Sequence, residues 1–141
     1  MKAVVSRVSR ASVRVDGVVV GQIEEPGLLV LLGVTHSDGD EEAEKMARKL
    51  HEIRILRDEQ SCASTDAPLL VVSQFTLYGS TQKGRRPSWS DAASGDQAES
   101  IVNAVITRLR ERAARVATGQ FAATMEVDSV NDGPFTVLVE V

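Results

Sequence analysis

The chain has 141 residues and a mass of 15.2 kDa, with 43% hydrophobic and 26% charged residues, which excludes collagen-like, coiled-coil and disordered proteins. This length suits one domain, which we place at residues 1–141. The formal net charge of −4 excludes a protein that binds nucleic acid by bulk attraction, because that attraction scales with the number of cations offered. A small basic patch directed at one end of an RNA is compatible with this charge.

Cysteine usage and the N-terminal sequence indicate the compartment. The single Cys62 excludes a disulfide framework within the chain and is interpreted as an incidental thiol in a reducing compartment. The longest apolar run, residues 28–34, is too short to span a bilayer, and residues 1–7 lack a signal-peptide pattern. We therefore expect a cytoplasmic protein with no membrane partner.

Strands are predicted in the first part of the chain. Asp16-Gly17 lies between two β-branched runs and is a strong hairpin signal, because a type I′ turn needs positive φ at both central positions. Residues 2–9 are predicted as a further strand. Gly27 opens the apolar run 28–32, which is typical of a strand buried on both faces.

An amphipathic helix follows, with Asp40 as its expected N-cap. Residues 53–56 are then expected to form a short strand, and residues 60–68 a polar loop. The apolar stripe of this helix recurs at helical spacing and comprises Ala43, Met46, Ala47, Leu50 and Ile53.

The second half of the chain repeats this order. Residues 69–72 are predicted as another strand buried on both faces, and residues 78–91, rich in Gly, Ser and Arg, as a loop. A second helix is predicted over residues 94–116, with Gly119 ending the element. Its apolar stripe comprises Val102, Val105, Ile106, Leu109, Ala113 and Val116.

Two strands are predicted near the C-terminal end, over residues 125–130 and 135–139, with Asn131-Asp132-Gly133-Pro134 between them. Strands buried on both faces beside amphipathic helices indicate layers, with helices packed on a sheet. The predicted fold class is α/β, with a mixed sheet covered by two main helices.

Polar residues follow the 69–72 strand directly. Side chains alternate along a strand, so Ser73 and Phe75 are expected to face one way and Gln74 and Thr76 the other. Buried polar groups must be hydrogen-bonded, or each costs about 1–3 kcal/mol. Two interpretations remain: a strand that emerges into solvent, or a polar wall at a strand end, where open α/β sheets hold ligands.

Classical nucleophilic and metal sites are disfavoured. Ser73 lacks a Gly-x-Ser-x-Gly elbow, and only His36 and His51 are available as a base. Asp38 and Asp40 near His36 have neither the spacing of a calcium loop nor its closing Glu, so cap-and-turn chemistry explains them better. We expect no metal and no cofactor.

The segment 131–134 admits two interpretations. On physical grounds alone a hairpin turn is the simpler one. However, the Gly133–Pro134 bond can be cis at a cost of only about 0.5–1 kcal/mol. A cis bond would turn two successive carbonyls to the same side and create an acceptor pair without any side chain.

A basic segment is the third candidate site. Lys83, Arg85 and Arg86 precede the only tryptophan, Trp89, and this combination suits contacts to phosphates and a base. The alternative is a solvated loop. Three arginines on one flank of the second helix could extend the patch, unless they form an ordinary solvated face: Arg108, Arg112 and Arg115.

Two separated motifs, in order, resemble the D-aminoacyl-tRNA deacylase family. They are Ser73-Gln74-Phe75-Thr76-Leu77 and Asn131-Asp132-Gly133-Pro134-x-Thr136. The similarity runs nearly end to end and includes residues 7–13, 27–34 and 83–88. The resemblance implies barrel-like β layers in a β/β/α arrangement, and hydrolysis of the ester that joins a D-amino acid, or glycine, to the 3′-terminal adenosine of tRNA.

The resemblance also implies a homodimer in which each subunit inserts a Gly-cis-Pro peptide into the active site of its partner. Gly133 and Pro134 match that peptide, and Arg7 matches the arginine that holds it. Two fixed carbonyls would hold the substrate's amino group, so that an L side chain would clash with backbone while a D side chain points to open space.

Catalytic and substrate-binding roles follow from the same resemblance. Thr76, by its main-chain amide, is assigned with Gln74 and Ser73 to orientation and charge stabilisation, assisted by the substrate's own 2′-hydroxyl. Phe75 and Met125 match residues that line the pocket. The tRNA contacts are assigned to Lys83, Arg85 and Arg86.

The sequence departs from the family pattern at Phe135, where Val is usual, at Trp89, where Phe is more usual, and in residues 60–68. One rival is the related deacylase that removes L-alanine from a noncognate tRNA, but it typically shows Pro-Gln-Ala-Thr at the Ser73 motif. A second rival is a non-catalytic RNA-binding module, and the free-standing length argues against such an appendage.

Overall fold

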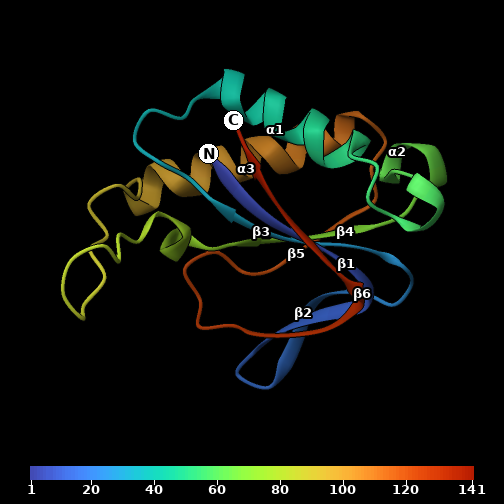
Figure 1. Ribbon diagram of the computed structural model, residues 1–141, viewed down its shortest axis with the longest axis horizontal. Coiled ribbons are helices and arrows are strands. Elements are labelled where there is room, and N and C mark those ends of the chain that lie inside the picture. Colours follow the sequence, from blue (N-terminus) through green and yellow to red (C-terminus); the bar gives the residue numbers. More distant parts are fainter.

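Six strands form one mixed sheet in the computed structural model, which describes residues 1–141 (Figure 1). The strand order is β2-β1-β3-β4-β5, and β6 also pairs with β1. Pairings among β1, β2, β3 and β6 are antiparallel, whereas β3-β4 and β4-β5 are parallel. The strands are β1 (Lys2–Val15), β2 (Val18–Ile23), β3 (Gly27–Gly33), β4 (Leu69–Ser73), β5 (Val116–Thr118) and β6 (Glu126–Glu140).

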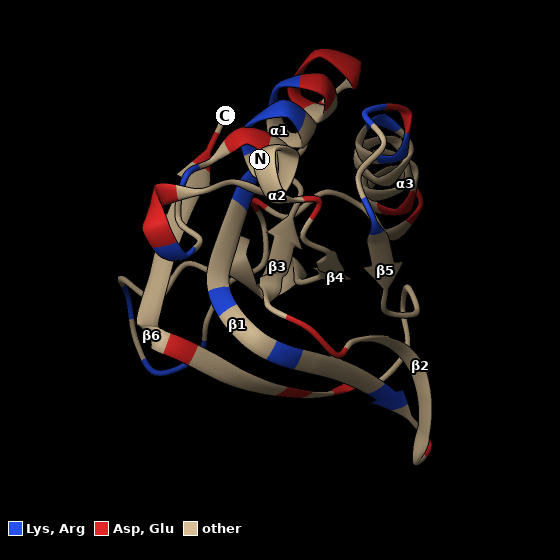
Figure 2. Ribbon diagram, turned by 90° about the vertical axis from the view of Figure 1, so that its right-hand side faces the viewer, with Lys and Arg blue, Asp and Glu red and all other residues tan.

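Two long helices, α1 (Asp40–Glu52) and α3 (Gly95–Glu111), lie side by side on one face of the sheet (Figures 1 and 2). A short helix, α2 (Cys62–Thr65), and two 3₁₀ turns, Arg57–Glu59 and Phe75–Tyr78, complete the elements. The predicted apolar stripes are buried within the two helices, because they face the sheet and each other. Their last members are not buried: Ile53 and Val116 are half-buried and Ala113 is exposed. None of the helices is both long and apolar enough to cross a membrane.

The hairpin prediction is confirmed. Asp16 and Gly17 have φ of 50° and 78°, and β1 pairs with β2 from Val15 opposite Val18 onward. The strand predicted over residues 2–9 is longer than expected. It continues to Val15 as one element, because its first half pairs with β3 while its second half pairs with β2.

Two hydrophobic clusters explain why β3 and β4 are apolar on both faces. The larger cluster fills the space between the sheet and the helices, and includes Leu28 and Leu69. The smaller lies on the other face, enclosed by the curved sheet, and includes Leu29 and Leu70. Adjacent residues of one strand therefore enter different cores, as expected for strands covered on both faces.

The sheet curls until β2 approaches β5. A Cβ atom at Gly21 of β2 would lie 2.0 Å from the carbonyl oxygen of Thr118 in β5, so this close approach requires glycine. The result is a nearly closed, barrel-like mixed sheet with helices on one face. The predicted α/β class with barrel-like layers is confirmed.

Several predicted boundaries of the first half are wrong. Gly39, not Asp40, is the N-cap of α1. The backbone N–H of Gly39 donates a hydrogen bond to the Glu42 carboxylate at 2.9 Å. Residues 53–56 form no strand beyond an isolated bridge at Leu56. The 60–68 loop contains α2, because Ser61 caps it by accepting a hydrogen bond from the Ser64 N–H.

The second long helix ends earlier than predicted. It stops at Glu111, and Ala113 has a left-handed φ of 62° that turns the chain back to the sheet. Val116 therefore belongs to β5, which pattern analysis missed because this strand has only three residues. Gly119 follows β5 and does not end the helix.

The hairpin interpretation of residues 131–134 is wrong. Both halves of β6 run antiparallel to β1: Ser129 lies opposite Ala11, and Thr136 lies opposite Ser6. The register shifts between them, because Asn131 and Thr136 are separated by four residues while their partners on β1 are separated by one. The segment is therefore a wide bulge in a single long strand.

Candidate functional site

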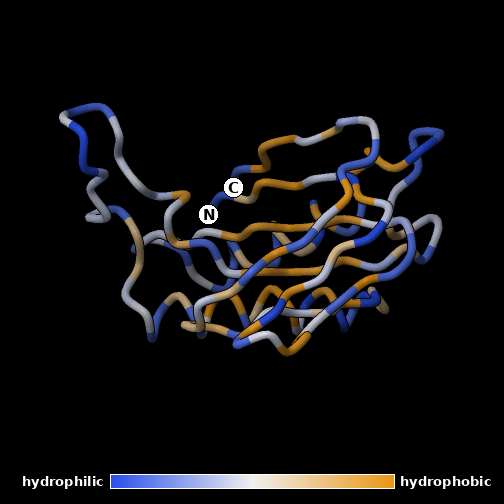
Figure 3. Tube along the Cα trace, turned by 90° about the horizontal axis from the view of Figure 1, so that it is seen from below, coloured by the Kyte–Doolittle hydropathy of each residue, from blue (hydrophilic) through white to orange (hydrophobic).

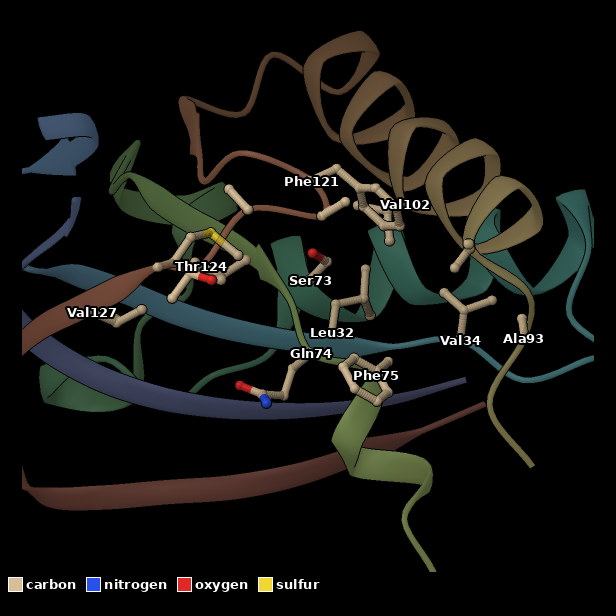
Figure 4. Close-up of a pocket in the computed structure, with 16 residues that line it drawn as sticks. Leu32, Val34, Ser73, Gln74, Phe75, Ala93, Val102, Phe121, Thr124 and Val127 are labelled. Carbon is tan, nitrogen blue, oxygen red and sulfur yellow. The ribbon is translucent and has the colours of Figure 1, made fainter. Parts of the chain in front are cut away.

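A cavity of about 620 Å³ opens beside the end of β4 (Figure 4). Its walls come from the ends of β3 and β4, the first half of α3 and the segment 121–127. None of its 16 lining residues carries an ionisable side chain, and 12 are hydrophobic. Chemistry in this cavity must therefore depend on neutral polar groups and backbone, not on a charged acid, base or nucleophile of its lining.

Ser73, Gln74 and Phe75 form one wall of this cavity. Figure 4 shows Ser73 and Gln74 projecting in different directions from the end of β4, with Phe75 beyond them. Strand pairing ends here, where the Gln74 N–H donates to the Leu32 carbonyl at 2.8 Å. The predicted alternation stops at Ser73, because the chain turns into the 3₁₀ helix Phe75–Tyr78.

The turn at Phe75–Tyr78 brings polar groups together. The Gln74 side-chain amide donates a hydrogen bond to the Thr76 hydroxyl, which fixes both side chains. Phe75 and Thr76 occupy the first positions of the 3₁₀ helix, where backbone N–H groups have no acceptor within the helical turn. Of these two residues Phe75 lines the cavity, whereas Thr76 is not among the lining residues.

Met125 lines the same cavity. Its sulfur packs against Gly119, where a Cβ atom would lie only 2.7 Å away. Pattern analysis missed Phe121 and Val102, which form the opposite wall (Figure 4). Val102 was predicted as a core residue of its helix, and no sequence signal distinguishes a side chain that lines a cavity from one in the core.

Gly133, Pro134 and Arg7 do not line the cavity of their own chain. The Gly133–Pro134 peptide is cis, and both residues are exposed on the bulge of β6. Arg7 lies beneath them: its Nε donates to the Asp132 carbonyl at 2.8 Å, and its guanidinium lies 4.8 Å from the centre of the Phe135 ring.

Asp132 also binds a second arginine, Arg57. The Arg57 Nη2 and Nε donate to the two carboxylate oxygens of Asp132 at 2.6 and 3.1 Å. These hydrogen bonds hold the pKa of the Asp132 carboxyl below its usual value. The peptide segment that presents Gly133 is thus held from beneath by Arg7 and from the side by Arg57.

The predicted basic loop projects from the body of the molecule, at the yellow-green end of Figure 1, and its tip is hydrophilic in Figure 3. Lys83, Arg85 and Arg86 are exposed. The arginines of α3 and the segment after it do not extend this patch, because they form ion pairs with carboxylates: Arg108 and Arg112 with Glu44, and Arg115 with Glu25.

The residues disfavoured as catalytic groups lie elsewhere. His36 Nε2 hydrogen-bonds the Ser90 carbonyl at 2.7 Å, His51 lies on α1, and neither lines the cavity with Ser73. A Ser-His pair is therefore not formed. Cys62 is buried, and this burial raises the pKa of its thiol to about 12, as expected for an unreactive cysteine.

The family model described as D-Tyr-tRNA(Tyr) deacylase matches residues 4–140. The chain belongs to this family. Two curated relatives, both called D-aminoacyl-tRNA deacylase, align over the whole of both chains: the protein of Thermobifida fusca is 63% identical over 141 residues, and that of Streptomyces coelicolor is 61% identical.

Two solved structures share the fold of this chain. A structure described as c-Myc DNA Unwinding Element Binding Protein superposes with a TM-score of 0.92 at 39% identity, covering 100% of this chain and 99% of the other. A probable eukaryotic D-amino acid tRNA deacylase superposes with a TM-score of 0.85 over 99% and 98% of the two chains, and at 16% identity it shows the fold alone. The family and the enzyme class expected from the two motifs are confirmed.

Proposed function

We propose that this chain hydrolyses the ester of D-aminoacyl-tRNA, and of mischarged glycyl-tRNA, as a homodimer in the cytoplasm. The observation that carries the proposal is the wall of Ser73, Gln74 and Phe75 beside a cavity with no ionisable lining residue. An aminoacyl ester is already reactive, so it needs a positioned water and a stabilised oxyanion more than a strong base. The names of the relatives from Thermobifida fusca and Streptomyces coelicolor support the same substrate class.

The reaction requires few groups from the protein. A water oxygen bonds to the carbonyl carbon, the bond from that carbon to the ribose 3′-oxygen breaks, and this oxygen leaves as a hydroxyl after taking a proton. The backbone N–H of Thr76 stabilises the negative charge that develops on the carbonyl oxygen. Gln74 and Ser73 orient the ester, and the neighbouring 2′-hydroxyl of the substrate assists the water.

Rejection of L-amino acids is assigned to Gly133 and Pro134 of the partner subunit's chain. In one chain these residues are exposed and lie outside the cavity, which leaves them free to enter the cavity of a second copy. Carbonyl groups of this segment would hold the substrate's amino group, and an L side chain would meet backbone that cannot rotate away.

Exposed apolar residues on β6 support association of two copies. Val127, Val130, Phe135 and Leu138 are between 38% and 72% exposed on this 15-residue strand, which has a single partner strand in the chain. Large exposed apolar groups and an unpaired strand edge are features of interfaces. The bulge that carries Gly133 lies among these residues, so association through β6 would place it at the interface.

Contacts to the RNA are assigned to Lys83, Arg85 and Arg86. These cations project on a loop beyond the cavity, while the chain as a whole is acidic. Such an arrangement suits an enzyme that binds only the acceptor end of its tRNA, because bulk attraction is weak. We expect the affinity for tRNA to fall as the salt concentration rises, with the slope that a few phosphate contacts produce.

The decisive test compares hydrolysis of D-tyrosyl-tRNA and L-tyrosyl-tRNA, with and without a chelator. We expect D-selective release that the chelator does not change. Equal rates on the two enantiomers would overturn the proposal. Retention of charged tRNA without release would indicate a binding module, and preferential hydrolysis of L-alanyl-tRNA would indicate the related deacylase. Sedimentation of the enzyme should show a dimer.

A further inference from the structure

Phe75 and Trp89 form an exposed aromatic pair at the mouth of the cavity. Their ring centres are 5.4 Å apart and the planes meet at 68°, an edge-to-face arrangement. Phe75 is 57% exposed and lines the cavity. Trp89 is 43% exposed, contacts the Phe75 ring and does not itself line the cavity. Aromatic surface of this extent at a site entrance is available to a ligand.

Trp89 is fixed in place by backbone. A Cβ atom at Gly79 would lie 2.5 Å from Cζ3 of the indole, so the ring packs directly on a bare glycine. Ser80 and Ser88 pair through two backbone hydrogen bonds of 2.8 and 3.0 Å, which close the base of the loop just before Trp89. The ring is therefore already positioned before a ligand arrives, which reduces the entropy lost on binding.

Free cations lie on the loop that Trp89 ends. Lys83, Arg85 and Arg86 form no ion pair in the structure, whereas most arginines elsewhere do. Aromatic rings beside unpaired cations are the combination that binds single-stranded nucleic acid, since bases stack on the rings while the cations contact phosphates.

We propose that Phe75 and Trp89 form a stacking subsite for an unpaired base, one nucleotide before the terminal nucleotide that carries the ester. The loop cations contact the phosphates that flank this base. The inference rests on the proposed function for the identity of the RNA. It adds a second point of recognition, at the mouth of the cavity, that depends on the single-stranded character of the acceptor end and not on the amino acid.

A binding experiment tests the subsite without catalysis. Trp89 is the only tryptophan of the chain, so intrinsic fluorescence reports on this ring alone. An RNA minihelix with a single-stranded cytidine-cytidine-adenosine tail should quench the fluorescence and saturate, and a blunt minihelix of the same duplex sequence should not. Equal quenching by the two RNAs, or none by either while a labelled minihelix binds, would overturn the subsite.

A kinetic experiment separates stacking from mere support of Phe75. Trp89→Leu keeps an apolar cover over Gly79 but removes the aromatic face, and Trp89→Phe keeps a smaller face. We expect Trp89→Leu to raise KM for D-tyrosyl-tRNA roughly tenfold, within the range measured for loss of one base-stacking residue, with little change in kcat. Trp89→Phe should restore most of this loss.

The matched substrate for this experiment is D-tyrosyl-adenosine, which has no preceding nucleotide. Trp89→Leu should change its hydrolysis far less than that of the tRNA. Equal losses on both substrates would mean that Trp89 only supports Phe75, and would overturn the subsite. If the wild-type chain hydrolyses neither substrate, the proposed function fails, while the fluorescence experiment still decides whether the subsite exists.

Discussion

Two regions of this molecule serve one proposed reaction by opposite physical means. The wall at the end of β4 is uncharged: Ser73, Gln74 and Phe75 line a cavity without an ionisable side chain. The bulge of β6 is held by charge, since Arg7 and Arg57 both bind Asp132 next to Gly133. In the proposed reaction the wall supplies uncharged hydrogen-bond donors next to the ester. In the bulge, charged side chains hold the backbone of Gly133 in position.

This difference predicts which substitutions should impair each region most. In the proposed reaction the wall acts through backbone N–H groups, so loss of an N–H should matter more there than loss of a side chain. The bulge depends on the position of a glycine, so added side-chain volume should matter more there than the loss of one exposed charge. Four predictions test this contrast.

The largest effect is expected at the bulge from Gly133→Ala. Gly133 has a φ of 137°, and a Cβ atom there would lie 2.6 Å from Nη2 of Arg7. The positive φ strains any L side chain, and the added methyl group must displace either the Arg7 guanidinium or the backbone of the bulge. A displacement of about 1 Å at a substrate-binding segment can cost roughly a hundredfold in rate. We therefore expect the rate of D-tyrosyl-tRNA hydrolysis to fall by about this factor, measured beside the rate on L-tyrosyl-tRNA.

Gly17→Ala is the matched control for that substitution. Gly17 also has a positive φ, 78°, but no atom lies within 4 Å of its added Cβ. We expect some loss of thermal stability and no loss of D-selective activity. Wild-type kinetics of Gly133→Ala would remove the bulge from the selection mechanism.

The next effect tests the wall through Thr76. Thr76→Pro removes the backbone N–H and should lower kcat by about a hundredfold, the loss typical of one oxyanion donor. Thr76→Ala keeps the N–H and removes the hydroxyl that accepts from Gln74, so it should lower kcat by less than about tenfold. Steady-state hydrolysis of D-tyrosyl-tRNA distinguishes them. Both substitutions remove the hydroxyl, so equal losses in Thr76→Ala and Thr76→Pro would assign catalysis to the hydroxyl instead.

A smaller effect compares the two arginines beneath the bulge. The Arg7 side chain is 13% exposed and donates to the Asp132 backbone, whereas the Arg57 side chain is 69% exposed. Loss of a half-buried charged donor costs about 1.5–3 kcal/mol, while exposed ion pairs contribute about 0–1 kcal/mol. The ratio of D to L hydrolysis should fall about tenfold in Arg7→Ala and less than about threefold in Arg57→Ala. The reverse order would contradict the assigned support.

The smallest effect is a pH dependence of stability. Arg57 lowers the pKa of the folded Asp132 carboxyl, so this carboxylate stabilises the folded chain above the ordinary Asp pKa of 3.8, and that stability is lost as the pH falls through the folded value. Thermal unfolding between pH 7 and pH 3 should show a smaller acid-dependent loss in Asp132→Asn than in the wild type. Parallel curves would show that the ion pair has no net effect.

Much of the fold was determined by local sequence. Asp16-Gly17 specified its hairpin, because few residue pairs accept positive φ at both positions of a type I′ turn. The apolar stripes specified which faces of α1 and α3 are buried, because burial repeats with the helical period. The Ser73 and Gly133 motifs specified the family, which the match over residues 4–140 confirms.

Tertiary structure decided what these local patterns could not. Gly133 lies outside the cavity of its own chain. The three residues of β5 form a strand only by pairing with β4. Phe121 and Val102 line the same cavity because α3 folds back over the sheet. Periodicity reports the environment of one segment at a time. The meeting of distant segments depends on how layers pack and how far the sheet curls, and so only the folded chain brings the cavity walls together and leaves the bulge of β6 facing outward.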